Sequence, residues 1–310
     1  MAVRGVMRLG EVCIRVLDAQ EARRHYDSRL GLHEVFEDSD GRIYLKAWDE
    51  QDHHSLVLVP AQQAGVVHVA FKVSADSLLD EYAERLDRHG AKVRHVPAGT
   101  YPRTGRRIAF ITPSGHEIHL YAQMEHVGNT LGTHNPGVIP DEGVIRGLRI
   151  NRLDHALLAG PGVTETCRLF VDALDFSVAE QLVDAQTQEP LAVFLSCSNK
   201  PHDIAFVRQA QPGAFHHVSF TLESTQDVVH AADMIGKYRI PVEVGPNRHG
   251  ITRGATIYFF DPSGNRNEVF SGGYVYYPDS PTLTWDTTQF GTALFSQDNT
   301  VRESFLSVLT

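Results

Sequence analysis

The chain repeats part of its own sequence, and this repeat limits the folds open to it more than any other feature. The segment VHVAF around His68 resembles HHVSF around His217, and TPSG around Pro113 resembles DPSG around Pro262. Both pairs lie 149 positions apart (217 − 68 and 262 − 113) in a chain of 310 residues. Two separate landmarks with one offset indicate two related halves, each of the size of an ordinary domain.

Each half is expected to contain one supersecondary unit twice. In each unit a short apolar strand leads to an amphipathic helix, and several short strands follow. Helices are predicted over Asp76–His89, Val163–Ala173 and Thr225–Ile235, with Gly236 ending the last of them. The sequence therefore predicts an α+β fold in which four βαβββ modules pair into two tandem domains. Each pair is expected to form a cupped sheet around a cavity.

This arrangement divides the chain into three parts. Residues 1–147 are expected to form the first domain, residues 148–273 the second, and residues 274–310 an extension that packs on the second domain. The segment Met124–Leu148 is rich in Gly, Asn and Pro, so it is the expected connection between the domains.

Composition argues against several classes of protein. The net charge is −10, from 28 basic and 38 acidic residues, which argues against a broad nucleic-acid-binding surface. No stretch approaches the roughly 18–20 apolar residues of a membrane helix, and the first residues lack the apolar core of a signal peptide. A cytoplasmic protein without a membrane partner is therefore expected. Cys13, Cys167 and Cys197 are far apart, which indicates neither a disulfide nor a thiolate metal site.

Three residues of the second half have the types expected of a metal site. His155, His217 and Glu268 each lie on or beside a predicted strand. Because alternate side chains share one face of a strand, His217 is expected to point into the cup while Val218 faces a helix. Two imidazoles and one carboxylate match the facial triad of non-haem iron(II), which leaves open positions for substrate and dioxygen. The neighbouring His216 is an alternative ligand, although the repeat favours His217.

The first half carries related residues at the matching positions. Glu11, His68 and His119 correspond, in that order, to the three candidate ligands, and His68 and His119 are 51 positions apart, as are the second and third ligands. We expect these three residues to satisfy one another in a remnant pocket, with the first domain free of metal.

Four segments of the second half identify a family. Leu153–Leu157, Phe215–Phe220, Arg248–Thr252 and Thr256–Phe270 closely resemble the catechol 2,3-dioxygenases, which are type I extradiol dioxygenases of the vicinal-oxygen-chelate superfamily. The last segment, TIYFFDPSGNRNEVF, is long and specific, and the resemblance covers essentially the whole chain.

The resemblance implies a reaction and its participants. It implies that His155, His217 and Glu268 bind Fe(II), and that the protein cleaves the ring of catechol with O2 to give 2-hydroxymuconic semialdehyde. It also implies a homotetramer. The ligand types themselves accept manganese as well as iron.

Further roles follow from the same resemblance. His202 is implied as the active-site acid and base, and a near-neutral pKa would suit that work. His249 and Tyr258 are implied to hydrogen-bond the substrate oxygens, whereas the residues alone favour a core aromatic at Tyr258. The matching first-half positions differ in part, since His54 corresponds to His202 but Ala109 replaces Tyr258.

One departure from the family and three rival functions stay open at this point. Arg253 stands where close relatives are expected to carry a histidine, so the preferred catechol substituents are not determined. The alternatives are an extradiol enzyme for a substituted or bicyclic catechol, a glyoxalase-type isomerase, and a metal-free binding protein of the same fold.

Overall fold

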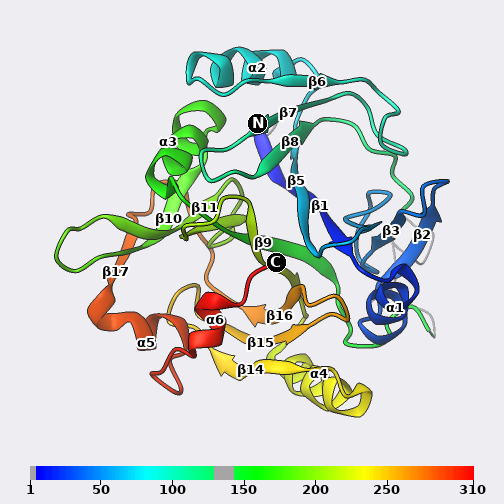
Figure 1. The fold of residues 1–310 in the computed structure, drawn as a ribbon, viewed down its shortest axis with the longest axis vertical. Helices are drawn as coiled ribbons and strands as arrows, with labels where there is room; N and C mark the ends of the chain where they lie inside the picture. Colours follow the sequence, from blue (N-terminus) through cyan, green and yellow to red (C-terminus); the bar gives the residue numbers. More distant parts are fainter. Residues whose placement is uncertain (1–4, 129–142) are drawn as a thin grey trace.

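The computed structural model describes residues 5–128 and 143–310 (Figure 1). Its first half alternates strands and helices in the order that the repeat predicts. The bounds of these elements are β1 Val6–Val16, α1 Ala19–Arg23, the π-helical turn η1 Arg24–Arg29, β2 His33–Glu37, β3 Ile43–Lys46, β4 Leu56–Pro60, β5 Gly65–Val73, α2 Leu78–Arg88, β6 Arg94–Val96, β7 Arg107–Ile111 and β8 Glu117–Tyr121.

The second half repeats this order and continues into the C-terminal extension. Its elements are β9 Arg152–Gly160, α3 Val163–Leu174, β10 Ser177–Val183, β11 Pro190–Ser196, β12 Ile204–Arg208, β13 Ala214–Thr221, α4 Thr225–Tyr238, β14 Val242–Arg248, β15 Gly254–Phe260, β16 Arg266–Gly272, β17 Leu283–Asp286, the 3-10 turn η2 Thr287–Gln289, α5 Phe290–Leu294 and α6 Glu303–Ser307. None of the helices in the two described ranges has the length and apolar character needed to cross a membrane.

The strands form two sheets in which equivalent strands are neighbours. The first sheet has the order β2-β3-β4-β1-β5-β8-β7-β6, and the second has the order β10-β11-β12-β9-β13-β16-β15-β14, with β17 added beside β10. In each sheet the first strands of two modules pair antiparallel at the centre, β1 with β5 and β9 with β13. The predicted α+β fold of paired βαβββ modules is confirmed.

Some predicted elements differ from the observed ones. Strands β2, β10 and β17 were not predicted, and β2 is an edge strand with mostly polar, partly exposed residues that give little apolar signal. Gly236 does not end α4, which continues to Tyr238 and ends where Arg239 adopts a left-handed conformation. A glycine inside a helix costs only about 1 kcal/mol, so the packing of the helix outweighs it. The expected connection Met124–Leu148 lies largely outside the described residues.

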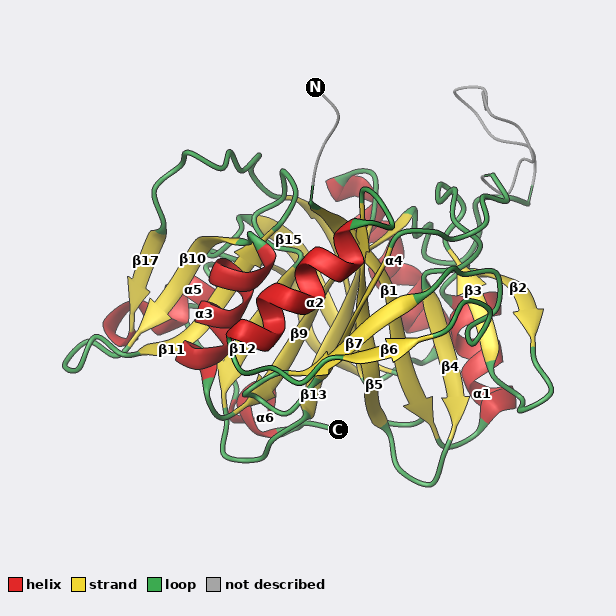
Figure 2. Ribbon diagram, turned by 90° about the horizontal axis from the view of Figure 1, so that it is seen from above, coloured by secondary structure: helices red, strands yellow, loops and turns green. Residues whose placement is uncertain are grey.

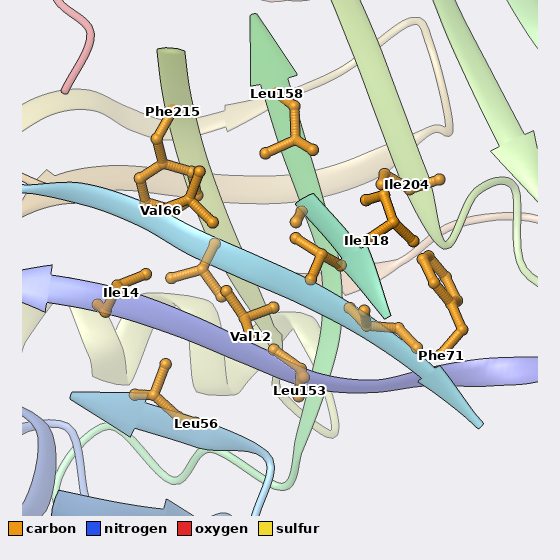
Figure 3. Close-up of a cluster of buried hydrophobic side chains, with 14 of the residues drawn as sticks. Val12, Ile14, Leu56, Val66, Phe71, Ile118, Leu153, Leu158, Ile204 and Phe215 are labelled. Atoms are coloured by element: carbon orange, nitrogen blue, oxygen red, sulfur yellow. The ribbon is translucent and has the colours of Figure 1, made fainter. Parts of the chain in front are cut away.

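The two halves share one main hydrophobic core. Val12 and Ile14 of β1 are fully buried in it, as are Phe71 of β5, Leu158 of β9 and Phe215 of β13. Figure 3 shows these side chains converging from strands of both sheets. Burying apolar area stabilises a fold by about 25 cal/mol per Å², so this shared core ties the two sheets together.

Contacts between helices and strands also join the halves. Helix α2 packs against α3, and the two lie side by side in Figure 2. On another side Tyr26 of η1 is fully buried, and its hydroxyl donates to Asp261 Oδ2 and accepts from Asn267 Nδ2, each at 3.0 Å. The Nε2 of His25 is also 3.0 Å from Asn267 Oδ1. This buried network holds the first module against the fourth.

Replacing Tyr26 with phenylalanine is expected to destabilise the protein, because the buried Asn267 Nδ2 would lose its partner and Asp261 Oδ2 would keep only Asn265. Leaving such groups unsatisfied costs about 1–3 kcal/mol. Urea unfolding followed by fluorescence measures the change. Tyr44→Phe is the control, since the Tyr44 hydroxyl donates to the partly exposed Asp38, a residue of its own half. Equal midpoints for the two variants would contradict the importance of this network.

Candidate metal centre

Three neighbouring strands bring the three candidate ligands to one place. His155 lies on β9, His217 on β13 and Glu268 on β16. Ser219 of β13 pairs with His155 on one side and with Glu268 on the other. His217 precedes Ser219 by two residues, so both side chains leave the same face of the strand. Val218 leaves the opposite face and belongs to the main core.

The ligand atoms of these three residues lie at the separations that one metal ion requires. His155 Nε2 is 3.0 Å from Glu268 Oε2, His217 Nε2 is 3.3 Å from the same oxygen, and the two nitrogens are 3.2 Å apart. Two ligands at right angles with bonds of about 2.1 Å would be about 3.0 Å apart. All three side chains are buried, and they form the one such cluster found in the described part of the chain. The donor set therefore fits a divalent cation.

Neighbouring groups orient two of these ligands from behind. Asp154 Oδ2 is 2.7 Å from His155 Nδ1, which leaves Nε2 free to face the other ligands. Thr256 Oγ1 donates to Glu268 Oε1 at 2.5 Å, which leaves Oε2 facing the two imidazoles. Groups that hold metal ligands in this way commonly fix their orientation and raise their affinity for metal.

The alternative ligand His216 is directed away from the cluster. Its Nε2 is 2.8 Å from the carbonyl oxygen of Phe305, and its Nδ1 is 2.7 Å from His217 Nδ1. Both ring nitrogens of His216 are thus engaged, and His216 orients His217 instead of joining the three ligand atoms.

Burial and charge set the protonation of the metal-free centre. Burial opposes ionisation of Glu268, yet hydrogen bonds from His155 and His217 hold the pKa of its carboxyl well below the usual value. Burial lowers the pKa of His217 to about 4, so its imidazole is neutral at neutral pH. Burial acts in the same direction on His155, but Asp154 and Glu268 outweigh it and raise its pKa to about 9. A divalent cation would therefore take the place of one proton on His155.

The ligand atoms open into a cavity with largely apolar walls. Leu157, Phe194 and Ile251 line it from the second domain, and Leu294 and Phe305 line it from the C-terminal extension. In Figure 1 the extension helices α5 and α6 lie beside β14 and β15, which is consistent with this contribution. The cavity can therefore accept a flat apolar molecule next to the cluster.

The three residues implied as substrate contacts all line this cavity. The ring of His202 lies 4.1 Å from that of His155, centroid to centroid. His249 Nε2 is 2.9 Å from the Tyr258 hydroxyl, and His249 Nδ1 contacts the carbonyl oxygen of Leu294. Tyr258 also packs in a small cluster with Phe295 and other apolar side chains, so it is both a packed aromatic and a polar group of the cavity.

The expected near-neutral pKa of His202 is wrong for the metal-free protein. Burial, together with the positive charge of His155, lowers the pKa of His202 well below the ordinary histidine value. Burial and the charge of Glu268 raise the pKa of Tyr258 well above its ordinary value. His202 is therefore a neutral imidazole, and a weaker base than an ordinary histidine, in the metal-free protein. Tyr258 carries a hydroxyl hydrogen that it can donate.

The matching residues of the first half are arranged differently. Glu11 receives two hydrogen bonds from the guanidinium of Arg107, at 3.0 and 2.7 Å, and its oxygens also lie 2.6 and 2.9 Å from His68 and His54. His119 stacks on His68 with ring centroids 4.0 Å apart. Glu11 is thus neutralised by a side-chain cation that was not predicted. The expectation that Glu11, His68 and His119 satisfy one another holds only for Glu11 and His68, since His119 Nε2 lies 2.6 Å from Glu117 Oε1.

Sequence reasoning missed several residues around the centre. It did not select Asp154, Thr256 or Lys200, although Asp154 directly precedes His155 and could have been tested as its partner. It also singled out Arg253 as a departure from the family. The guanidinium carbon of Arg253 lies 5.1 Å from the centre of the Tyr274 ring, and Arg253 is absent from the cavity lining among the described residues.

Comparison with known proteins identifies the family of this fold and site. Residues 66–125 match the model of the catechol 2,3-dioxygenase-like N-terminal domain. Residues 152–269 match the Glyoxalase/Bleomycin resistance protein/Dioxygenase superfamily. The metapyrocatechase of Pseudomonas sp. (strain CF600) is 45% identical over 99% of both chains. The manganese-dependent 2,3-dihydroxybiphenyl 1,2-dioxygenase of Geobacillus genomosp. 3 is 27% identical over 90% of both chains.

Solved structures agree with this assignment. A 2,3-dioxygenase of Pseudomonas sp. KL28 superposes with a TM-score of 0.90 at 40% identity, covering 93% of this chain and 99% of that one. A homoprotocatechuate 2,3-dioxygenase of Brevibacterium fuscum, in complex with 3,4-dihydroxyphenylacetate, superposes with a TM-score of 0.87 at 26% identity, covering 99% and 93%. The chain therefore belongs to the metapyrocatechases, the catechol 2,3-dioxygenases among the extradiol enzymes of the dioxygenase superfamily.

Proposed function

We propose that His155, His217 and Glu268 hold one Fe(II) ion. The protein uses this ion to cleave the catechol ring between one hydroxyl-bearing carbon and the adjacent carbon without a hydroxyl, giving 2-hydroxymuconic semialdehyde. The observation that carries this proposal is the convergence of two buried imidazole nitrogens and a carboxylate oxygen within 3.3 Å of one another, beside an apolar cavity. The choice of iron over manganese rests on the facial triad and the family resemblance, since a relative depends on manganese.

The cofactor and the side chains have separate tasks in this proposal. When bound, Fe(II) supplies the Lewis acidity and the electron that allow catechol and dioxygen to react in one coordination sphere. In this proposal His202 takes a proton from a substrate hydroxyl, because it lines the cavity and its Nδ1 has no hydrogen-bond partner among the described residues. The same imidazole can return that proton to oxygen later in the reaction. In this proposal the Tyr258 hydroxyl and the His249 imidazole, which lie 2.9 Å apart in the cavity lining, bond a substrate oxygen.

Removing one metal ligand is expected to abolish metal binding, whereas the matching change in the first half is not. In this proposal His217→Ala loses its iron because two protein ligands hold the ion too weakly, and His68→Ala retains one iron per chain. Metal analysis after removal of loose iron measures both variants. If the two variants lost iron equally, or if the wild type held two ions per chain, the assignment of one site to the second half would be wrong.

His202→Ala is expected to keep its iron and lose turnover. General acid–base catalysis typically contributes about 10²–10⁴-fold, so kcat should fall within that range. An oxygen electrode measures uptake with catechol, which also separates a dioxygenase from a glyoxalase-type isomerase. The control is His54→Ala, the matching buried histidine of the first half. Oxygen uptake by His202→Ala at the rate of the His54→Ala control would remove His202 from the mechanism.

The charges around the cavity favour uncharged catechols. Its described lining contains the carboxylates of Asp154 and Glu268 but no lysine or arginine. A substrate carboxylate would therefore be buried without a cation, which costs several kcal/mol. We expect kcat/KM for 4-ethylcatechol to exceed that for 3,4-dihydroxyphenylacetate, a molecule of similar size, by at least about 100-fold. Comparable values for the two substrates would contradict this specificity.

The remaining features of the proposal concern organisation and assembly. We divide the chain into a metal-free first domain at residues 1–147, a catalytic domain at residues 148–273 and an extension at residues 274–310. Support comes from the separate sheets and from the packing of Phe295 and Phe305 on β14 and β15. A homotetramer in the cytoplasm rests on the family resemblance alone, and light scattering of the purified protein tests the assembly.

A further inference from the structure

A lysine next to the metal centre bridges two buried carboxylates. Lys200 Nζ lies 3.3 Å from Asp154 Oδ1 and 3.1 Å from Asp203 Oδ1, and it donates to the backbone carbonyl of Asp154 at 2.5 Å. Asp154 and Asp203 are almost fully buried, while the lysine side chain is about one-third exposed. The first carboxylate contacts His155, so a single ammonium group is two contacts away from this proposed ligand.

The second carboxylate shapes the loop that carries His202. Asp203 Oδ2 accepts from the backbone N–H groups of Cys197 and Ser198, at 2.9 and 3.1 Å, and both of its oxygens lie within 3.1 Å of the Ser198 hydroxyl. These bonds close the loop between β11 and β12, in which His202 directly precedes Asp203. Lys200 therefore connects this loop to β9, the strand that supplies His155.

The first half of the protein lacks this bridge although it has the same fold. Strand β12 pairs with β9 as β4 pairs with β1, so the two registers align residues of the two halves. Lys200 is aligned with Asp52, and Asp203 with Ser55. Asp154, which directly precedes the first candidate ligand, is aligned with Gly10. None of the three charges is conserved between the halves, and one is reversed. The first module, β1 to β4, therefore folds without this bridge. The bridge occurs in the half that also contains the candidate metal centre.

We infer that Lys200 is a positioning residue of the metal centre, which holds the ligand His155 through Asp154 and the acid–base residue His202 through Asp203. This inference rests on the proposed function. Without the ammonium group Asp154 would lose the cation that restrains its carboxylate, and His155 would lose its fixed orientation. The loop would also lose its tie to β9, so His202 would be displaced from the reacting atoms.

The test compares two lysines that make similar contacts in different halves. Lys200→Met keeps most of the side-chain stem but removes the charge. Lys72→Met is the matched control, because Lys72 Nζ lies 2.7 and 2.8 Å from the carboxylate oxygens of Asp52 in the first half. Ferrous affinity is measured by competition with a chelator, kcat and KM with catechol, and folding by urea unfolding. Lys200→Arg, which restores the charge, tests for rescue.

We expect Lys200→Met to lose at least about 10-fold in iron affinity, as groups behind metal ligands usually contribute. It should also lose kcat at saturating iron, with a smaller change in KM, while Lys72→Met matches the wild type in both and Lys200→Arg recovers part of the loss. If Lys200→Met proves unfolded, Asp154→Asn, which keeps the side-chain shape, is expected to show the same fall in iron affinity.

Two results would overturn the inference. The first would leave the proposed function intact, and the second would not. If Lys200→Met or Asp154→Asn folds and equals Lys72→Met in iron affinity and kcat, then the bridge has no positioning role while the proposed function stands. If the wild type itself neither binds Fe(II) nor consumes oxygen with catechol, the proposed function and the inference both fail.

Discussion

The pairing of three strands around Ser219 is the constraint on which the metal centre depends. A slip of one residue would turn His217 toward the main core and bring Val218 to the cavity, since side chains alternate between the two faces. The register shift between Phe215 and His217 makes the local pairing irregular, yet Phe215 and Val218 are both fully buried in the main core. Hydrophobic burial on one face therefore sets the position of the ligands on the other.

The two halves solve one electrostatic problem in different ways. Each buries a carboxylate among imidazoles, which is costly unless a positive charge is nearby. In the first half Arg107 supplies that charge and bonds both oxygens of Glu11. In the second half the residue aligned with Arg107 is Thr256, a neutral side chain that bonds one oxygen of Glu268. The position facing the other oxygen is thus open to an exchangeable cation, whereas both oxygens of Glu11 are already bonded by a guanidinium.

The C-terminal extension completes the site instead of merely covering it. Its backbone carbonyls contact the histidines behind and beside the ligands, with Leu294 on His249 and Phe305 on His216. Its side chains close the apolar wall of the cavity. Because water is kept from this wall, charge interactions at the centre are stronger than they would be in solvent.

Sequence alone determined the repeat, the α+β class and the grouping of His155, His217 and Glu268 as candidate ligands, because strand periodicity and a shared offset can be read along the chain. Most strand positions followed from apolar residues, whereas the polar edge strand β2 lacked that signal. The tertiary structure alone decided which charged side chains lie behind the candidate ligands and their first-half counterparts. Lys200 reaches Asp154 across 46 positions, and Arg107 reaches Glu11 across 96. Such contacts depend on the three-dimensional packing of strands, in which residues distant along the chain become neighbours, so no spacing in the sequence reveals them.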